Sequence, residues 1–86
     1  MSYVVSPSCV ACEVDDGIAI LDLRSNTYFG VNSVGADVWS RMSNPTSLDD
    51  LSAAIANEYS VNPAECRADI AALLDDMVKH GLVQTV

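Results

Sequence analysis

The chain reads LDLRSNTYFGVN from Leu21 to Asn32, and this stretch separates two kinds of hydrophobic pattern. Before it, apolar residues recur with a period of about two between turn signals, which is typical of β-strands. After it, they recur at helical spacing almost to the end of the chain. Within it, Arg24-Ser25-Asn26 is a polar turn that leads into a strand over Thr27–Val31. The stretch therefore predicts strands followed by helices.

Two more strands are predicted on the N-terminal side of this turn. Cys9–Val14 is a run of mostly small or β-branched residues, and Asp15-Asp16-Gly17 after it contains the Asp-Gly pair of a tight hairpin. Ile18–Leu23 is apolar on both faces, which indicates a strand that is central or covered on both sides. A short extra strand at Tyr3–Ser6, ended by Pro7, is a further option.

Three helices are predicted after the strands, each with a polar residue that can accept from free backbone N–H groups: Asn32 or Ser33, then Ser47, then Asn62. Asn44-Pro45 ends the first helix and Gly81 ends the third, after which Leu82-Val83 packs back or adds a short strand. The predicted apolar stripes are Val34, Val38, Trp39 and Met42; Leu48, Leu51, Ile55 and Tyr59; and Cys66, Ile70, Leu73, Leu74, Met77 and Val78. Residues 1–86 are thus predicted to form one α+β domain, winged helix-turn-helix-like, with a three-stranded antiparallel sheet followed by three helices.

The composition argues against several classes of function. The net charge is −8, and the four basic residues are scattered singly, whereas nucleic-acid binding needs clustered Lys and Arg. An acidic winged-helix regulator or interaction module is therefore only an alternative. The acidic surface either favours a basic partner or simply keeps the domain in solution. No signal peptide and no membrane-spanning run is evident, and the odd number of three cysteines fits a reducing compartment, so we expect a cytoplasmic protein.

The reactive side chains do not combine into a credible active site. Cys9, Cys12, Cys66 and His80 are four potential zinc ligands, but residues three apart on a strand point to opposite faces. Cys66 lies on an apolar helical stripe, as a core residue would. His80 is the only histidine, and no nucleophile and base accompany it. We therefore expect no enzyme, no catalytic residue, no cofactor and no bound metal.

The edge of the predicted sheet is the remaining candidate site. A three-stranded sheet leaves unpaired backbone groups, and Thr27–Val31 combines strong strand propensity with the small Gly30. An extended peptide can add a strand to such an edge. An ordinary core strand explains the same residues equally well.

The segment Leu21–Asn32, followed by Gly35 and Trp39, resembles the PqqD-like family. That family shows a strand, a short polar turn, an aromatic pair, a small or apolar residue, then Asn and a Gly-x-x-x-Trp helix. Later segments are also similar to the family, namely Ser47–Leu51, Asp69-Ile70 and Gly81-Leu82-Val83. The resemblance covers the chain from about Cys9 onward.

The resemblance implies a domain that binds the leader of a ribosomally made precursor peptide as an added strand, between the third strand and the third helix. It implies contacts from Thr27, Tyr28, Phe29, Gly30 and Val31 on the strand and from Asp69, Leu73, Asp76, Met77 and His80 on the helix. The two aspartates would attract Lys or Arg of the leader, and the two apolar helix residues would seat a leader side chain or pack in the core. Within the family, the chain is most similar to the free-standing leader-binding partner of the lasso-peptide protease. The partners implied are therefore the leader peptide and a maturation enzyme, namely that leader protease, with a radical SAM maturase as the alternative. No nucleic acid and no membrane are implied, and a homodimer through the unpaired strand stays open.

Overall fold

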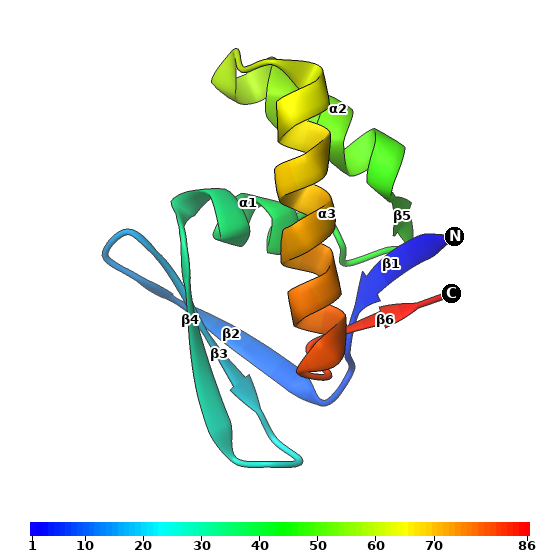
Figure 1. Ribbon diagram of the computed structural model, residues 1–86. Coiled ribbons are helices and arrows are strands. Elements are labelled where there is room, and N and C mark those ends of the chain that lie inside the picture. Colours follow the sequence, from blue (N-terminus) through cyan, green and yellow to red (C-terminus); the bar gives the residue numbers. More distant parts are fainter.

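The computed structural model describes residues 1–86, and its larger sheet confirms the predicted strands. The strands β2 (Cys9–Val14), β3 (Gly17–Asp22) and β4 (Thr27–Asn32) form an antiparallel sheet in the order β2-β3-β4 (Figure 1). The register places Ala11 opposite Ile20, and Ile20 opposite Phe29. β3 is therefore the central strand, as its apolar character predicts.

Only one face of this sheet is covered by the rest of the chain. Ile18 and Ile20 on the inner face of β3 are buried in the core, and Phe29 and Val31 of β4 pack against the core beside them. On the opposite face Tyr28 is 68% exposed. Of the two predicted explanations for the apolar faces of β3, the structure thus shows the central position and not the covering of both faces.

The three predicted helices are present, and each begins at a predicted cap. They are α1 (Ser33–Ser40), α2 (Leu48–Tyr59) and α3 (Pro63–Lys79). The side chains of Asn32, Ser47 and Asn62 accept hydrogen bonds from backbone N–H groups of the first turns. Gly81 has a φ of 75°, the left-handed conformation that follows a helix end. The protein thus has the winged helix-turn-helix-like α+β fold that the sequence predicts.

A second small sheet joins the two ends of the chain. It consists of β1 (Ser2–Val5), β5 (Thr46–Ser47) and β6 (Val83–Thr85) in the order β5-β1-β6. Ser2 and Val86 exchange two backbone hydrogen bonds of 3.0 and 2.8 Å, and Figure 1 shows both termini at the same corner. The extra strand near Tyr3 is therefore real, although it starts one residue earlier than predicted and ends before Ser6.

The core lies between the helices, the inner face of the larger sheet and the small sheet. Its residues are Tyr3, Ile18, Ile20, Val38, Met42, Leu51, Ile55, Ala56, Cys66, Ile70, Leu74, Met77, Leu82 and Val83. Tyr59 and Val78, which the helical stripes include, are exposed. Both lie in the last turn of their helix. No helix is both long and apolar enough to cross a membrane.

Candidate functional site

The edge of β4 that faces away from β3 has no partner strand. Its free backbone groups follow from the register. The two-residue turn at Asp15-Asp16 makes Val14 and Gly17 a hydrogen-bonded pair. Every second residue of β3, counted from Gly17, therefore directs its backbone N–H and C=O groups toward β2. The bond from the N–H of Leu23 to the carbonyl of Ser8 continues that alternation.

The residues of β3 between these direct their backbone N–H and C=O groups toward β4. This register determines which residues of β4 have backbone groups without a partner. Ile18 and Ile20 are bonded to Val31 and Phe29. Tyr28 and Gly30 then direct their N–H and C=O groups to the open edge. A Cβ built on Gly30 would have no neighbouring atom within 4 Å, so nothing in the chain blocks this part of the strand. We call the open side of Thr27–Val31 the docking edge.

The second predicted half of the site is one face of α3. Asp69, Asp76 and His80 are exposed and Leu73 is half-buried, and these four residues define what we call the α3 face. Met77 differs from them, because it is 2% exposed and belongs to the core. Met77 is thus the one predicted site residue that lies in the core, and its contact with a leader stays a prediction.

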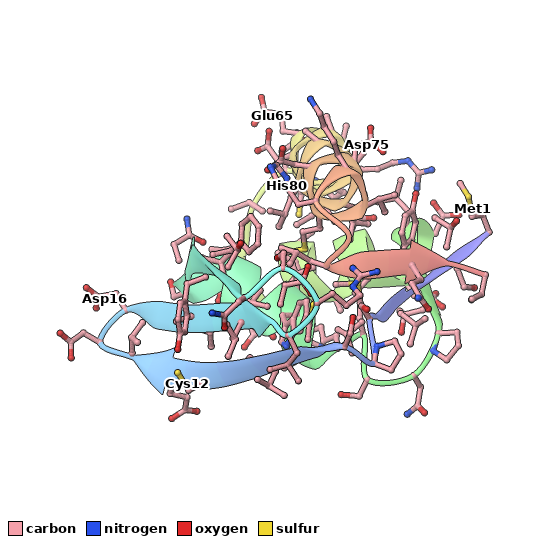
Figure 2. The ribbon with its side chains drawn as sticks, turned by 90° about the horizontal axis from the view of Figure 1, so that it is seen from below. Met1, Cys12, Asp16, Glu65, Asp75 and His80 are labelled. Carbon is pink, nitrogen blue, oxygen red and sulfur yellow. The ribbon has the colours of Figure 1, made fainter.

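The docking edge and the α3 face meet at a pair of rings. The rings of Phe29 and His80 lie edge to face, with centroids 5.3 Å apart and planes at 63°. Nδ1 of His80 lies 2.9 Å from the carbonyl oxygen of Asp76, one turn earlier in α3, which orients the imidazole. Figure 2 shows β4 on the side of the sheet nearer to α3, with His80 at the end of that helix. The C-terminal end of α3 thus contacts β4 through the rings of His80 and Phe29.

An arginine in the β3–β4 turn holds the end of α3 in place. The guanidinium of Arg24 donates to the carbonyl oxygen of Gly81 over 3.0 Å. The backbone N–H and the guanidinium of Arg24 also donate to the carboxylate of Asp22, at 3.0 and 3.4 Å. These bonds, led by that from the backbone N–H, hold the pKa of Asp22 below its ordinary value. Neither residue was predicted as part of the site, although an Asp two residues before an Arg in a hairpin turn is a usable signal.

A hollow of about 310 Å³ lies where α1, α2 and α3 meet, at the opposite end of the α3 face from His80. Six of its eight lining residues are hydrophobic; the full set is Val34, Ile55, Tyr59, Val61, Glu65, Cys66, Asp69 and Ile70. Asp69 belongs both to this hollow and to the α3 face. Sequence reasoning missed the hollow, because it is formed by three elements whose relative positions no local pattern specifies.

The three cysteines are free, and the two on β2 do not face each other. Cys9 pairs with Asp22 and Cys12 with Ala19, so the two side chains point to opposite faces of the sheet, as a strand requires. Cys66 is buried in the core, where its thiol contacts the carbonyl oxygen of Ser52 at 3.6 Å. No three His, Cys, Asp or Glu residues lie close enough together to hold a metal ion.

Fold and site together define a class of small α+β domains in which an open strand edge lies beside one face of a long helix. The chain belongs to the PqqD family, because the family described as coenzyme PQQ synthesis protein D (PqqD) matches residues 17–83. That range begins at β3 and ends at the start of β6, so it includes the docking edge and all three helices.

Two solved structures are similar to this chain over nearly its whole length. The complex of TbiB1 with the TbiA(beta) leader peptide has a TM-score of 0.86 and 28% identity, and the match covers 96% of each chain. A lasso peptide synthetase B1 complexed with the leader peptide has a TM-score of 0.84 and 26% identity, over 98% of this chain and 99% of that chain. A comparison with curated protein sequences finds no match.

Proposed function

We propose that this chain binds the leader segment of a ribosomally synthesised precursor peptide and delivers it to a maturation enzyme, a lasso-peptide leader protease. One observation carries this proposal: both similar solved structures are complexes with a leader peptide, and the matches cover 96% and 98% of this chain. The unpaired backbone of Tyr28 and Gly30 gives the leader a place to dock. The chain itself is not an enzyme.

Binding proceeds by strand addition at the docking edge. The leader exchanges backbone hydrogen bonds with Tyr28 and Gly30, and its side chains then point alternately toward the α3 face and away from it. Apolar leader residues on the helix side contact Leu73 and Phe29, both of which are half-buried and keep some free surface. Asp69 and Asp76 attract Lys or Arg of the leader. Ordering a flexible leader costs free energy, so we expect a Kd in the range of roughly nanomolar to micromolar.

Delivery works through effective concentration. Once the leader is held, the rest of the precursor is tethered close to whichever enzyme the domain contacts, and the second encounter becomes intramolecular. The domain contributes affinity and position, and the enzyme contributes the bond-breaking groups.

A second candidate partner is a radical SAM maturase, since the matching family is described by its role in coenzyme PQQ synthesis. The leader would dock in the same way. The two candidates differ only in the enzyme that receives the precursor, so pull-down with each purified enzyme separates them.

The test of the docking mode is a Tyr28→Pro variant. Proline removes the N–H of Tyr28, which has no partner within the chain, so the fold is retained while one bond to the leader is lost. We expect about tenfold weaker binding of a fluorescent leader peptide, measured by anisotropy with the leader of a precursor encoded beside this gene. Tyr28→Ala keeps the N–H and serves as the matched control, with affinity close to that of the wild type. A folded Tyr28→Pro variant with unchanged affinity contradicts strand addition at this edge.

A further inference from the structure

The face of the larger sheet opposite the core is apolar and uncovered. The register aligns Val10, Leu21 and Tyr28 across the three strands, and Cys12, Ala19 and Gly30 in the next row. Val10 is 50% exposed and Val14, on the same face, is 53% exposed. We call this surface the outer face; it consists of Val10, Cys12, Val14, Ala19, Leu21, Tyr28 and Gly30. Figure 2 shows Cys12 on the side of the molecule opposite α3, away from the predicted contacts on that helix.

The strand β2, which contributes Val10, Cys12 and Val14 to the outer face, also has an unpaired backbone edge. It lies at the other edge of the sheet, and five of its six residues are exposed. By the same alternation as above, Ala11 and Glu13 direct their backbone groups away from β3, to an edge with no partner strand. Exposed apolar edge strands invite association, and natural proteins usually shield them or use them. In this chain no other strand pairs with the outer edge of β2.

Charge favours a partner of a different kind over a second copy of this chain. The hairpin that carries Val10 and Val14 turns at Asp15 and Asp16, both exposed, so two acidic residues lie at one end of the apolar surface. Each copy has a net charge of −8, and a symmetric dimer through β2 would bring two such hairpins together. Like charges at an interface are unfavourable, whereas a partner with Lys and Arg around an apolar centre complements this surface.

We propose that the outer face, with β2, is the surface on which the maturation enzyme docks, through an apolar patch of the enzyme flanked by Lys or Arg. The proposal rests on the function proposed above and adds where the enzyme sits. The outer face is continuous with the docking edge, since Tyr28 and Gly30 belong to both. An enzyme bound to the outer face lies beside the bound leader and does not compete with it for the α3 face. The precursor can then pass from this domain to the enzyme.

The experiment compares two variants that make the same change in charge at different places. Val10→Lys puts a cation at the centre of the outer face, and Val86→Lys puts one on an exposed valine at the C-terminal end of the chain. The probe is the purified leader protease encoded beside the precursor gene, and its affinity for each variant is measured by biolayer interferometry with and without saturating leader peptide. Leader affinity is measured separately by anisotropy.

We expect Val10→Lys to weaken enzyme binding at least tenfold, with leader affinity within about twofold of wild type and with Val86→Lys unchanged in both. The proposal is overturned if Val10→Lys binds the enzyme as well as wild type does, or if the wild-type protein does not bind it at all. It is also overturned if the wild-type chain sediments as a dimer that Val10→Lys dissociates, because the face is then filled by a second copy. If the wild-type protein does not bind the leader in the anisotropy assay, the proposed function itself is contradicted. Failure of enzyme docking is instead measured by biolayer interferometry, so the two outcomes are distinguishable.

Discussion

Two neighbouring leucines on α3 allow stability and leader binding to be separated. Leu74 is 0% exposed and lies in the core, whereas Leu73 is half-buried on the α3 face. We replace each in turn by alanine, which removes the same atoms from two positions one residue apart. The expected results differ because the two side chains face different surroundings.

The magnitudes follow from burial. A fully buried Leu→Ala change costs about 2–5 kcal/mol, since it leaves a cavity as well as losing transfer free energy. A domain of 86 residues has a free energy of unfolding of about 4–13 kcal/mol, so Leu74→Ala removes a large part of it. Leu73→Ala loses about 1–2 kcal/mol of stability, because part of the side chain is already in water. Its free surface becomes buried when leader binds, so we expect leader affinity to fall about 5- to 30-fold.

The assays are urea unfolding followed by far-UV circular dichroism and leader anisotropy at 25 °C. A variant with about 2 kcal/mol of remaining stability is still about 97% folded, so Leu74→Ala should bind leader with nearly the wild-type Kd. The reasoning is refuted if Leu73→Ala leaves leader affinity unchanged, or if Leu74→Ala, tested where it is folded, weakens binding as much as Leu73→Ala does. Equal unfolding midpoints for the two variants would contradict the assignment of Leu74 to the core.

Two further predictions concern the hairpins. A Cβ on Gly17 would overlap the carbonyl oxygen of Val31, so Gly17→Ala should lower the free energy of unfolding by about 2 kcal/mol or more in urea, while Gly30→Ala, which meets open space, should change it by less than about 0.5 kcal/mol. Because the folded-state pKa of Asp22 is lowered by hydrogen bonds from Arg24, its carboxylate stabilises the fold above the ordinary pKa of 3.8 and this contribution is lost as the pH falls through the lowered value. The stability deficit of Asp22→Asn should therefore be largest near pH 7 and shrink as the pH approaches 3, and a deficit that stays constant with pH would show that the carboxylate does not act through its charge.

Local signals in the sequence predicted the elements and their caps well. The turn at Asp15-Asp16-Gly17 and the caps at Ser47 and Asn62 each depend on residues within three or four positions, so their outcome is decided within the segment itself. The structure confirms all three.

Predictions that depend on distant neighbours were less complete. Leu73 and Met77 lie one turn apart on the same side of α3, so helical spacing alone cannot tell a core residue from a surface one. Met77 is buried in the core of the folded chain, where α3 contacts distant elements such as β6. Similarly, an apolar strand face looks the same in sequence whether the chain covers it or a partner does, and the outer face around Leu21 is an example. The contacts of Thr27–Val31 and of the α3 face with a leader remain predictions.

The pairing of β1 with β6 has a consequence for the order in which the domain folds. Tyr3 opposes Thr85, so this contact closes a loop of nearly the entire chain, whereas β2, β3 and β4 are joined by short turns. Loop closure over many residues has a larger entropic cost and slows the step that requires it. We expect the hairpins that present Tyr28 and Gly30 to assemble early from local contacts, and the small sheet to lock Leu82 and Val83 into the core as a late event.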